Sequence, residues 1–249
     1  MHRFIVDPGN IQNGQVRIEG DDLKHLKKVL RLVPGDSINV FDGSGREYEA
    51  RLLSVDKTCA LAEITAVFQA ETEPGIRLTL YQGLLKGEKM DLIVQKGVEL
   101  GISRIVPMIT ERTVVQLDDD KGGKKALRWS KIAREASKQC RRAMVPHVSE
   151  PVAFDDALSQ LKRHEAVLLL YENESKKCLK ETLKCYTINK IKDIAVIVGP
   201  EGGFAPHEIE KYANSGFDVA GMGGRILRAE TAAISVIAII MYEMGELDR

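Results

Sequence analysis

The chain has 249 residues, of which 44% are hydrophobic and 29% charged, and its lysines plus arginines equal its aspartates plus glutamates at 36 each. These values are typical of a globular protein with one large domain or two modest ones, and any nucleic-acid binding must come from local clusters of basic residues. The longest apolar run, residues 232–241, is too short to span a bilayer. The four cysteines form no Cys-x-x-Cys pair and the histidines show no ligand spacing, so we expect a cytoplasmic protein with neither disulfides nor a metal site.

The first 68 residues predict several short strands around one helix. The expected strands are 3–6, 15–18, 37–41, 47–54 and 60–65. Short strands joined by hairpin turns favour a small β-barrel. The helix expected at 22–32 has an apolar stripe of leucines and a basic stripe that includes Lys24, Lys28 and Arg31. This basic stripe is either an ordinary solvated surface or a set of phosphate contacts.

A polar, acidic segment at 69–75 ends in Pro-Gly, so we place a domain boundary there, between domains at 1–70 and 75–249. Beyond it, apolar strands alternate with helices, which favours an α/β fold with a mostly parallel sheet. The expected strands are 76–83, 104–108, 166–171, 194–198 and 218–220. The expected helices lie near 89–100, 126–142, 154–161, 208–214 and 231–244.

Residues 121–142 carry the strongest charge signal in the chain. Nine lysines and arginines, among them Arg128, Lys138 and Arg142, are opposed only by Glu135. A helix with this much charge of one sign neutralises phosphates without regard to base sequence, so nucleic-acid binding is the favoured interpretation. The alternative is a solubilising surface helix.

Two glycine-rich turns each follow a predicted strand. Gly-Pro-Glu-Gly-Gly at 199–203 follows strand 194–198, and Gly-Met-Gly-Gly at 221–224 follows strand 218–220. We expect the turns to lie side by side at the carboxyl ends of parallel strands, where open α/β sheets bind ligands. A dinucleotide fingerprint that began at Gly221 would need glycine in place of Ile226, so this nucleotide motif does not fit. The alternative is two tight turns of an ordinary α/β domain.

Several stretches in both halves of the chain resemble a known protein family. GPEGGF at 199–204, GMGGRILRAETAA at 221–233 and QKGVELG at 95–101 resemble the SPOUT superfamily of S-adenosylmethionine-dependent RNA methyltransferases. Within it, the chain is most similar to the bacterial family that methylates N3 of a uridine in the 16S rRNA of the small ribosomal subunit. The chain departs from that family's pattern at 222–224, where Met-Gly-Gly replaces Leu-Gly-Pro without removing a chemical group.

The resemblance implies a fold, a cofactor and partners. It implies a trefoil-knotted SPOUT domain that follows a PUA-like, RNA-gripping barrel. It also implies a homodimer, and the apolar helix at 231–244 is either buried core or dimer interface. The residues expected to bind S-adenosylmethionine are Leu170, Gly199, Glu201, Gly202, Gly221, Met222, Ile226, Leu227, Arg228 and Ala232. The residues expected to bind RNA are Lys24, Lys28, Arg31, Lys96, Arg112, Arg128, Lys138 and Arg142, and no metal is expected.

Methyl transfer to uridine N3 is an in-line displacement for which the N3 proton must be removed. We expect Glu201 or Glu230 to accept that proton, and Arg142 or Arg228 to stabilise negative charge on the uracil oxygens. The alternatives are a helix-terminus role for Glu230 and a turn-shaping role for Glu201. The competing functions are a non-catalytic RNA-binding ribosome-assembly protein with the same fold and a nucleotide-dependent dehydrogenase.

Overall fold

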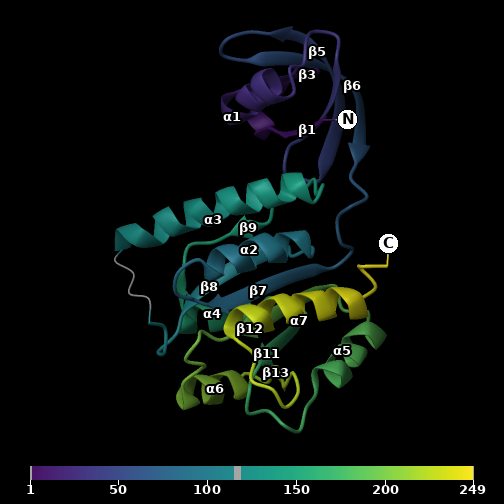
Figure 1. Ribbon diagram of the computed structural model, residues 1–249. Coiled ribbons are helices and arrows are strands. Elements are labelled where there is room, and N and C mark those ends of the chain that lie inside the picture. The colour runs from purple at the N-terminus through teal and green to yellow at the C-terminus, as the bar shows by residue number, and fades with distance from the viewer. Residues whose placement is uncertain (1, 115–118, 249) are drawn as a thin grey trace. The chain divides into compact units, whose positions relative to one another are not determined.

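The computed structural model describes residues 2–114 and 119–248 (Figure 1). They form two compact units, the first made of Met1–Glu73 with Ser137–Val145 and the second of Pro74–Ala136 with Pro146–Arg249. The break near residue 73 lies in the expected linker, but the expected division placed Ser137–Val145 in the other domain. Ala143 accounts for the difference, because it packs with Ile5 and Phe41 in a small buried cluster of the first unit.

The first unit is built on a six-stranded sheet with the order β1-β4-β5-β6-β3-β2. Its strands are β1 His2–Ile5, β2 Ile11–Gln12, β3 Gln15–Ile18, β4 Ser37–Phe41, β5 Arg46–Val55 and β6 Ala60–Gln69. β1 pairs with β4 in parallel, and the other neighbours are antiparallel. Alternate residues such as Val16, Ile18, Ile38 and Val40 enter one buried core, as the two-residue period of a strand requires.

The helix expected at 22–32 is shorter than the sequence predicted. α1 spans Gly20–Lys24 and continues as the π-helical segment η2 at His25–Val29, and a 3-10 turn, η1 at Pro8–Asn10, precedes β2. The helix does not continue to residue 32 because Arg31 has a left-handed backbone, with φ of 54°. Leu23 and Leu26 are buried, which leaves the basic side of the helix toward solvent.

The second unit contains a seven-stranded parallel sheet with the order β10-β8-β7-β12-β11-β13, in which β9 pairs with β8. Its strands are β7 Arg77–Gly83, β8 Arg104–Ile109, β9 His147–Val148, β10 Val152–Ala153, β11 Ala166–Leu170, β12 Asp193–Val198 and β13 Asp218–Ala220. β11 is buried throughout, as expected for a strand of a parallel sheet covered on both faces. β9 and β10 were not predicted, because two residues are too few to show a period.

Helices cover both faces of this sheet. α4 Phe154–Leu161 and α6 Pro206–Ala213 pack on the face that carries Tyr81 and Leu169. On the opposite face, α2 Lys89–Glu99 and α7 Ala229–Glu243 lie side by side, and α5 Leu179–Ile188 contacts α7 (Figure 1). α5 was not predicted, since threonine, cysteine, tyrosine and isoleucine are weak helix formers.

The long basic helix is α3, Asp119–Gln139, which begins and ends earlier than the predicted 126–142. Arg141 follows it with a left-handed backbone, with φ of 65°. Among the helices of the described residues, none is long and apolar enough to cross a membrane.

Candidate cofactor site

A cavity of about 470 Å³ lies at the carboxyl ends of three strands of the second unit. Its walls come from the ends of β11 and β12, from the residues that follow β11, β12 and β13, and from Lys89 at the start of α2; the three main segments are 170–172, 198–203 and part of 222–232. β11 lies between β12 and β13 in the sheet, so the two glycine turns flank the end of β11 instead of directly adjoining each other. This position and this size are those of small-molecule sites in open α/β sheets.

The first glycine turn is pressed against its neighbours. A Cβ on Gly83, the last residue of β7, would lie 2.4 Å from the backbone nitrogen of Pro200. Gly203 has φ of 67°, and its N–H donates to the Pro200 carbonyl at 2.9 Å, which closes the turn. At Gly83 only glycine fits without a shift of the backbone, and at Gly203 a larger residue would be strained by the positive φ and would press on the Glu172 carboxylate, 2.9 Å from the Cβ position.

The second glycine turn is held by the loop after β11. Gly221 N–H donates to the Lys177 carbonyl at 3.0 Å, and Leu179 N–H donates to the Gly221 carbonyl at 3.3 Å. A Cβ on Gly221 would lie only 2.2 Å from the Glu174 carbonyl oxygen. Residues 171–179, which are the loop after β11 with the first residue of α5 and are called the 171–179 loop here, therefore contact both the N–H and the carbonyl of Gly221.

Charged side chains meet at one wall of the cavity. Lys89 Nζ lies 3.0 Å from Glu201 Oε1 and 3.7 Å from Glu230 Oε2. Burial disfavours the charged form of Glu201, but hydrogen bonds from Lys89 and from the Lys86 N–H outweigh it and lower the pKa of Glu201. The same bond to Glu201 raises the pKa of Lys89. Glu230 Oε2 is buried without a hydrogen-bond partner among the described residues, so Glu230 is the less engaged carboxylate.

The structure brings most of the predicted site residues together. The expected cofactor-binding residues that line the cavity are Leu170, Gly199, Glu201, Gly202, Met222, Ile226, Leu227, Arg228 and Ala232. Gly221 lies at the start of the second turn, against the 171–179 loop. Of the expected catalytic residues, Glu201, Arg228 and Glu230 line the cavity, whereas Arg142 belongs to the first unit.

Three lining residues lie outside the two glycine-rich segments, 198–204 and 221–233, and were missed: Lys89, Tyr171 and Glu172. Tyr171 and Glu172 directly follow a buried strand, as the first glycine turn does, so the same signal could have found them. Lys89 comes from the start of α2, and only the pairing of β7 with β12 indicates that it lies near Glu201. Among the described residues, no group of three or more His, Cys, Asp or Glu side chains is placed to hold a metal ion.

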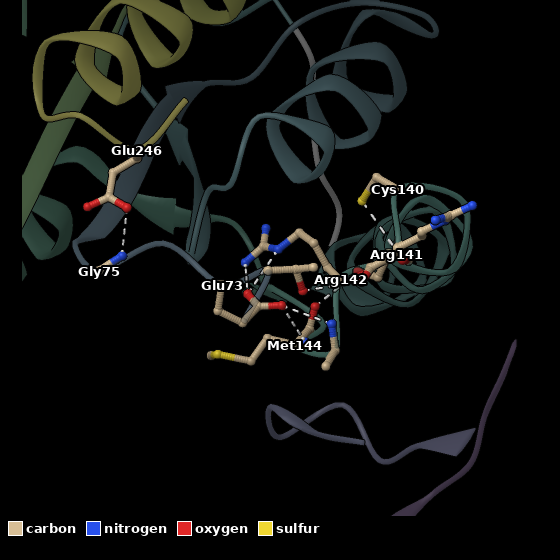
Figure 2. A network of polar contacts seen from close by, with 10 residues as sticks. Glu73, Gly75, Cys140, Arg141, Arg142, Met144 and Glu246 are labelled. Carbon is tan, nitrogen blue, oxygen red and sulfur yellow. Dashed lines mark hydrogen bonds and ion pairs between the residues drawn. The ribbon is translucent and has the colours of Figure 1, made fainter. Parts of the chain in front are cut away.

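Arg142 occupies a buried ion pair, which the sequence did not predict. Its Nη2 and Nε lie 2.8 and 3.1 Å from Glu73 Oε2 (Figure 2). Glu73 Oε1 accepts the N–H groups of Ala143 and Met144, each at 2.9 Å. Both roles expected for Arg142, RNA contact and charge stabilisation on uracil, require an accessible guanidinium, but this residue is only 4% exposed. In this structure Arg142 fastens residues 142–144 to Glu73.

The other candidate RNA-binding residues differ in accessibility. Those with exposed side chains are Lys24, Lys28, Arg31, Arg112 and Arg128. Arg112 also donates to the Gly202 carbonyl at 3.2 Å, which places it beside the first glycine turn. Several of the candidates already have acidic partners: Lys24 pairs with Asp21, Lys96 with Glu99, Arg128 with Asp91 and Lys138 with Asp22. The Lys121 side chain lies outside the described part of α3.

Fold and site together define a two-domain α/β protein with a ligand cavity at the carboxyl ends of its parallel strands. Residues 72–241 match the RNA methyltransferase domain family, and residues 18–65 match the RNA methyltransferase PUA domain family. The chain belongs to this RNA methyltransferase family, which confirms the resemblance to SPOUT methyltransferases and the PUA-like first domain.

Individual relatives match over nearly the whole chain. Ribosomal RNA small subunit methyltransferase E of Bacillus subtilis (strain 168) is 34% identical over 231 residues, which cover 91% of this chain and 89% of that protein. The structure of ribosomal RNA small subunit methyltransferase E from Neisseria gonorrhoeae bound to S-adenosyl methionine is 33% identical, with 97% of each chain covered and a TM-score of 0.82. A Legionella pneumophila methyltransferase in complex with the cofactor SAM is 32% identical, with 96% of each chain covered and a TM-score of 0.84.

Proposed function

We propose that this chain is an S-adenosylmethionine-dependent methyltransferase that methylates N3 of a uridine in the 16S rRNA of the small ribosomal subunit. The observation that carries this proposal is the cavity at the ends of β11, β12 and β13 in a chain of the RNA methyltransferase family. The rRNA substrate follows from the name of the Bacillus subtilis relative, and the cofactor from the two solved structures that hold it.

The residues of the cavity fit S-adenosylmethionine. Leu170, Met222 and Leu227 supply apolar surface for an adenine ring, and the bare backbone of the glycine turns supplies N–H and carbonyl groups. Glu201 is paired with Lys89, so the carboxylate of Glu172 is the one that suits a ligand with positive charge. Bound there, S-adenosylmethionine supplies an electrophilic methyl group.

The chain itself must remove the uridine N3 proton and stabilise the resulting ring anion. Glu230 is the better-placed acceptor, because its Oε2 is buried without a hydrogen bond among the described residues while Glu201 is engaged by Lys89 and the Lys86 N–H. Arg228 lines the same cavity, and its guanidinium is suited to stabilise charge on the uracil oxygens. We do not assign this role to Arg142, because its guanidinium is held in the ion pair with Glu73.

Transfer of labelled methyl from S-adenosylmethionine to small ribosomal subunits that lack the modification tests this function. We expect the label to be recovered as 3-methyluridine. Label on another nucleoside would still support an RNA methyltransferase but would contradict uridine N3 as its target. Absence of both labelling and cofactor binding would leave a non-catalytic assembly protein.

Glu230→Gln is expected to lower turnover by roughly a hundredfold or more, with S-adenosylmethionine affinity little changed, because the amide cannot accept the proton. Glu201→Gln is expected to lower turnover less, since Glu201 is already neutralised by Lys89. Single-turnover methyl transfer, together with calorimetry of cofactor binding, measures both effects. Unchanged turnover in both variants would rule out a carboxylate base at this site.

We propose that the exposed basic residues of the first unit contact RNA phosphates. The double change Lys28→Gln with Arg31→Gln is expected to weaken rRNA binding and to reduce the slope of log K against log salt by about one to two, because each lost phosphate contact reduces it by nearly one. Lys180→Gln, on the exposed side of α5, is the matched control. A slope unchanged from wild type would show that this side of the helix does not touch RNA.

We also propose the homodimer and the trefoil knot that the resemblance implies. The dimer is supported by α7, whose partly exposed Ile234, Ala238 and Ile239 and 60% exposed Tyr242 form an apolar strip. The knot is supported by the contacts of the 171–179 loop with Gly221. Sedimentation velocity of the purified chain tests the dimer, and a purely monomeric species would contradict it. A ribosomal substrate also implies the expected cytoplasmic location.

A further inference from the structure

We propose that Gln82 is a positioning residue of the cofactor site, whose side-chain amide holds the Gly199–Pro200 turn in the shape that forms one wall of the cavity. No sequence motif identifies this residue, and it does not itself line the cavity. The inference rests on the proposed function, in that the ligand of the cavity is taken to be S-adenosylmethionine.

Gln82 is fully buried near the end of β7, with 0% of its surface exposed, and it pairs with Val198 at the end of β12. Its Nε2 donates to the Gly199 carbonyl at 3.1 Å, to the Val198 carbonyl at 3.4 Å and to the Gly83 carbonyl at 3.0 Å. Two of these three acceptors belong to the point where β12 ends and the first glycine turn begins. The amide thus joins the neighbouring strand to the start of the turn.

Packing alone does not explain a glutamine at this position. Its neighbours in β7 include Leu78, Leu80 and Tyr81, and an apolar side chain would fill the same place in the sheet. Burial of an amide costs free energy unless its groups are hydrogen-bonded, and Oε1 of Gln82 has no hydrogen-bond partner among the described residues. Nε2 of Gln82 therefore donates to the turn although Oε1 is left without a hydrogen bond among the described residues. The contact with the turn thus explains why a glutamine stands at this position.

The turn needs such a donor because of its own composition. Pro200 has no N–H, and the close contact between Gly83 and Pro200 brings the backbone of the turn against β7. Without Gln82, the Val198 and Gly199 carbonyls would lose a buried donor, and the turn would relax toward other partners. Glu201, Gly202 and Gly203 follow directly and line the cavity, so such a movement would alter its shape.

Gln82→Met nearly conserves the side-chain volume and removes only the amide. We expect the dissociation constant for S-adenosylmethionine to rise about tenfold, because the carbonyls of Gly83, Val198 and Gly199 lose a buried donor and the turn that forms the cavity wall shifts. We expect kcat at saturating cofactor to change little, because Gln82 does not line the cavity. Gln95→Met is the matched control, since Gln95 is exposed on α2. Isothermal titration calorimetry and steady-state kinetics measure the two quantities.

Gln82→Glu gives a readout that general destabilisation would not produce. An ionised carboxylate would repel the two carbonyl oxygens, whereas a protonated carboxyl group can donate one hydrogen bond to them. Burial raises the pKa of a carboxyl group, so the affinity of this variant relative to wild type should recover as the pH falls from about 8.5 to about 6.

Three results would overturn the assignment: wild-type affinity in Gln82→Met, an equal loss in Gln95→Met, or no recovery of Gln82→Glu at low pH. Failure of the wild-type chain to bind S-adenosylmethionine would instead overturn the proposed function. The two failures are therefore distinguishable.

Discussion

Gly221→Ala is expected to weaken S-adenosylmethionine binding by roughly fivefold to 150-fold, the range that corresponds to an overpacking cost of about 1–3 kcal/mol. The added methyl group would lie 2.2 Å from the Glu174 carbonyl oxygen and 3.3 Å from the Glu174 carbonyl carbon. Both contacts are with backbone, so no side-chain rotation can relieve them. The 171–179 loop must move, and Tyr171 and Glu172, at its start, line the cavity.

Gly224→Ala is the matched control for this prediction. Gly224 belongs to the same turn, and a Cβ there would meet nothing within 4 Å. Calorimetric titration of both variants, with thermal unfolding as a check on the fold, compares them directly. Equal affinity in the two variants would show that the 171–179 loop can adjust without disturbing the cofactor site.

Glu73→Gln is expected to destabilise the first unit by about 3–5 kcal/mol, the usual cost of removing one partner of a buried ion pair. The side chains of Arg142 and Glu73 are only 5% and 14% exposed. An amide at position 73 would leave the guanidinium without its counter-charge and would present a donor to the N–H groups of Ala143 or Met144. Residues 142–144 should therefore detach from Glu73.

Urea unfolding followed by circular dichroism measures this loss, and hydrogen exchange of residues 137–145 localises it. Glu71→Gln is the control, because Glu71 is exposed two residues earlier. The double variant Glu73→Gln with Arg142→Met should lose less than the sum of the two single variants, since the unpaired buried charge is then absent. Additive losses, or a loss below about 1 kcal/mol for Glu73→Gln, would show that the pair contributes little.

The elements with a strong local period were predicted well. β3, β4, β13 and α4 have the predicted bounds, because alternating or helical apolar positions are visible within a few residues. The glycine turns were found because their glycines directly follow predicted strands, which is also visible within a few residues. β9, β10 and α5 were missed because their sequences are too short or too weak in propensity to show a period.

The candidate site was predicted only in part. The sequence placed Gly199 and Glu201 in the first glycine turn and Arg228 in the segment after the second, and all three line the cavity. Lys89 was missed because its distance to Glu201 depends on which strands are neighbours. Arg142 was assigned to RNA or uracil from its basic surroundings, but burial against Glu73 cannot be read from charge along the chain.

By itself the sequence determined the class of fold, the glycine turns and the local concentration of basic charge, because each of these depends on residues close together in the chain. The tertiary structure alone decided that β11 separates the two turns, that Lys89 joins Glu201 and Glu230, and that Gln82 reaches the Gly199 carbonyl. These contacts join residues far apart in the chain, and strand order and burial bring them together.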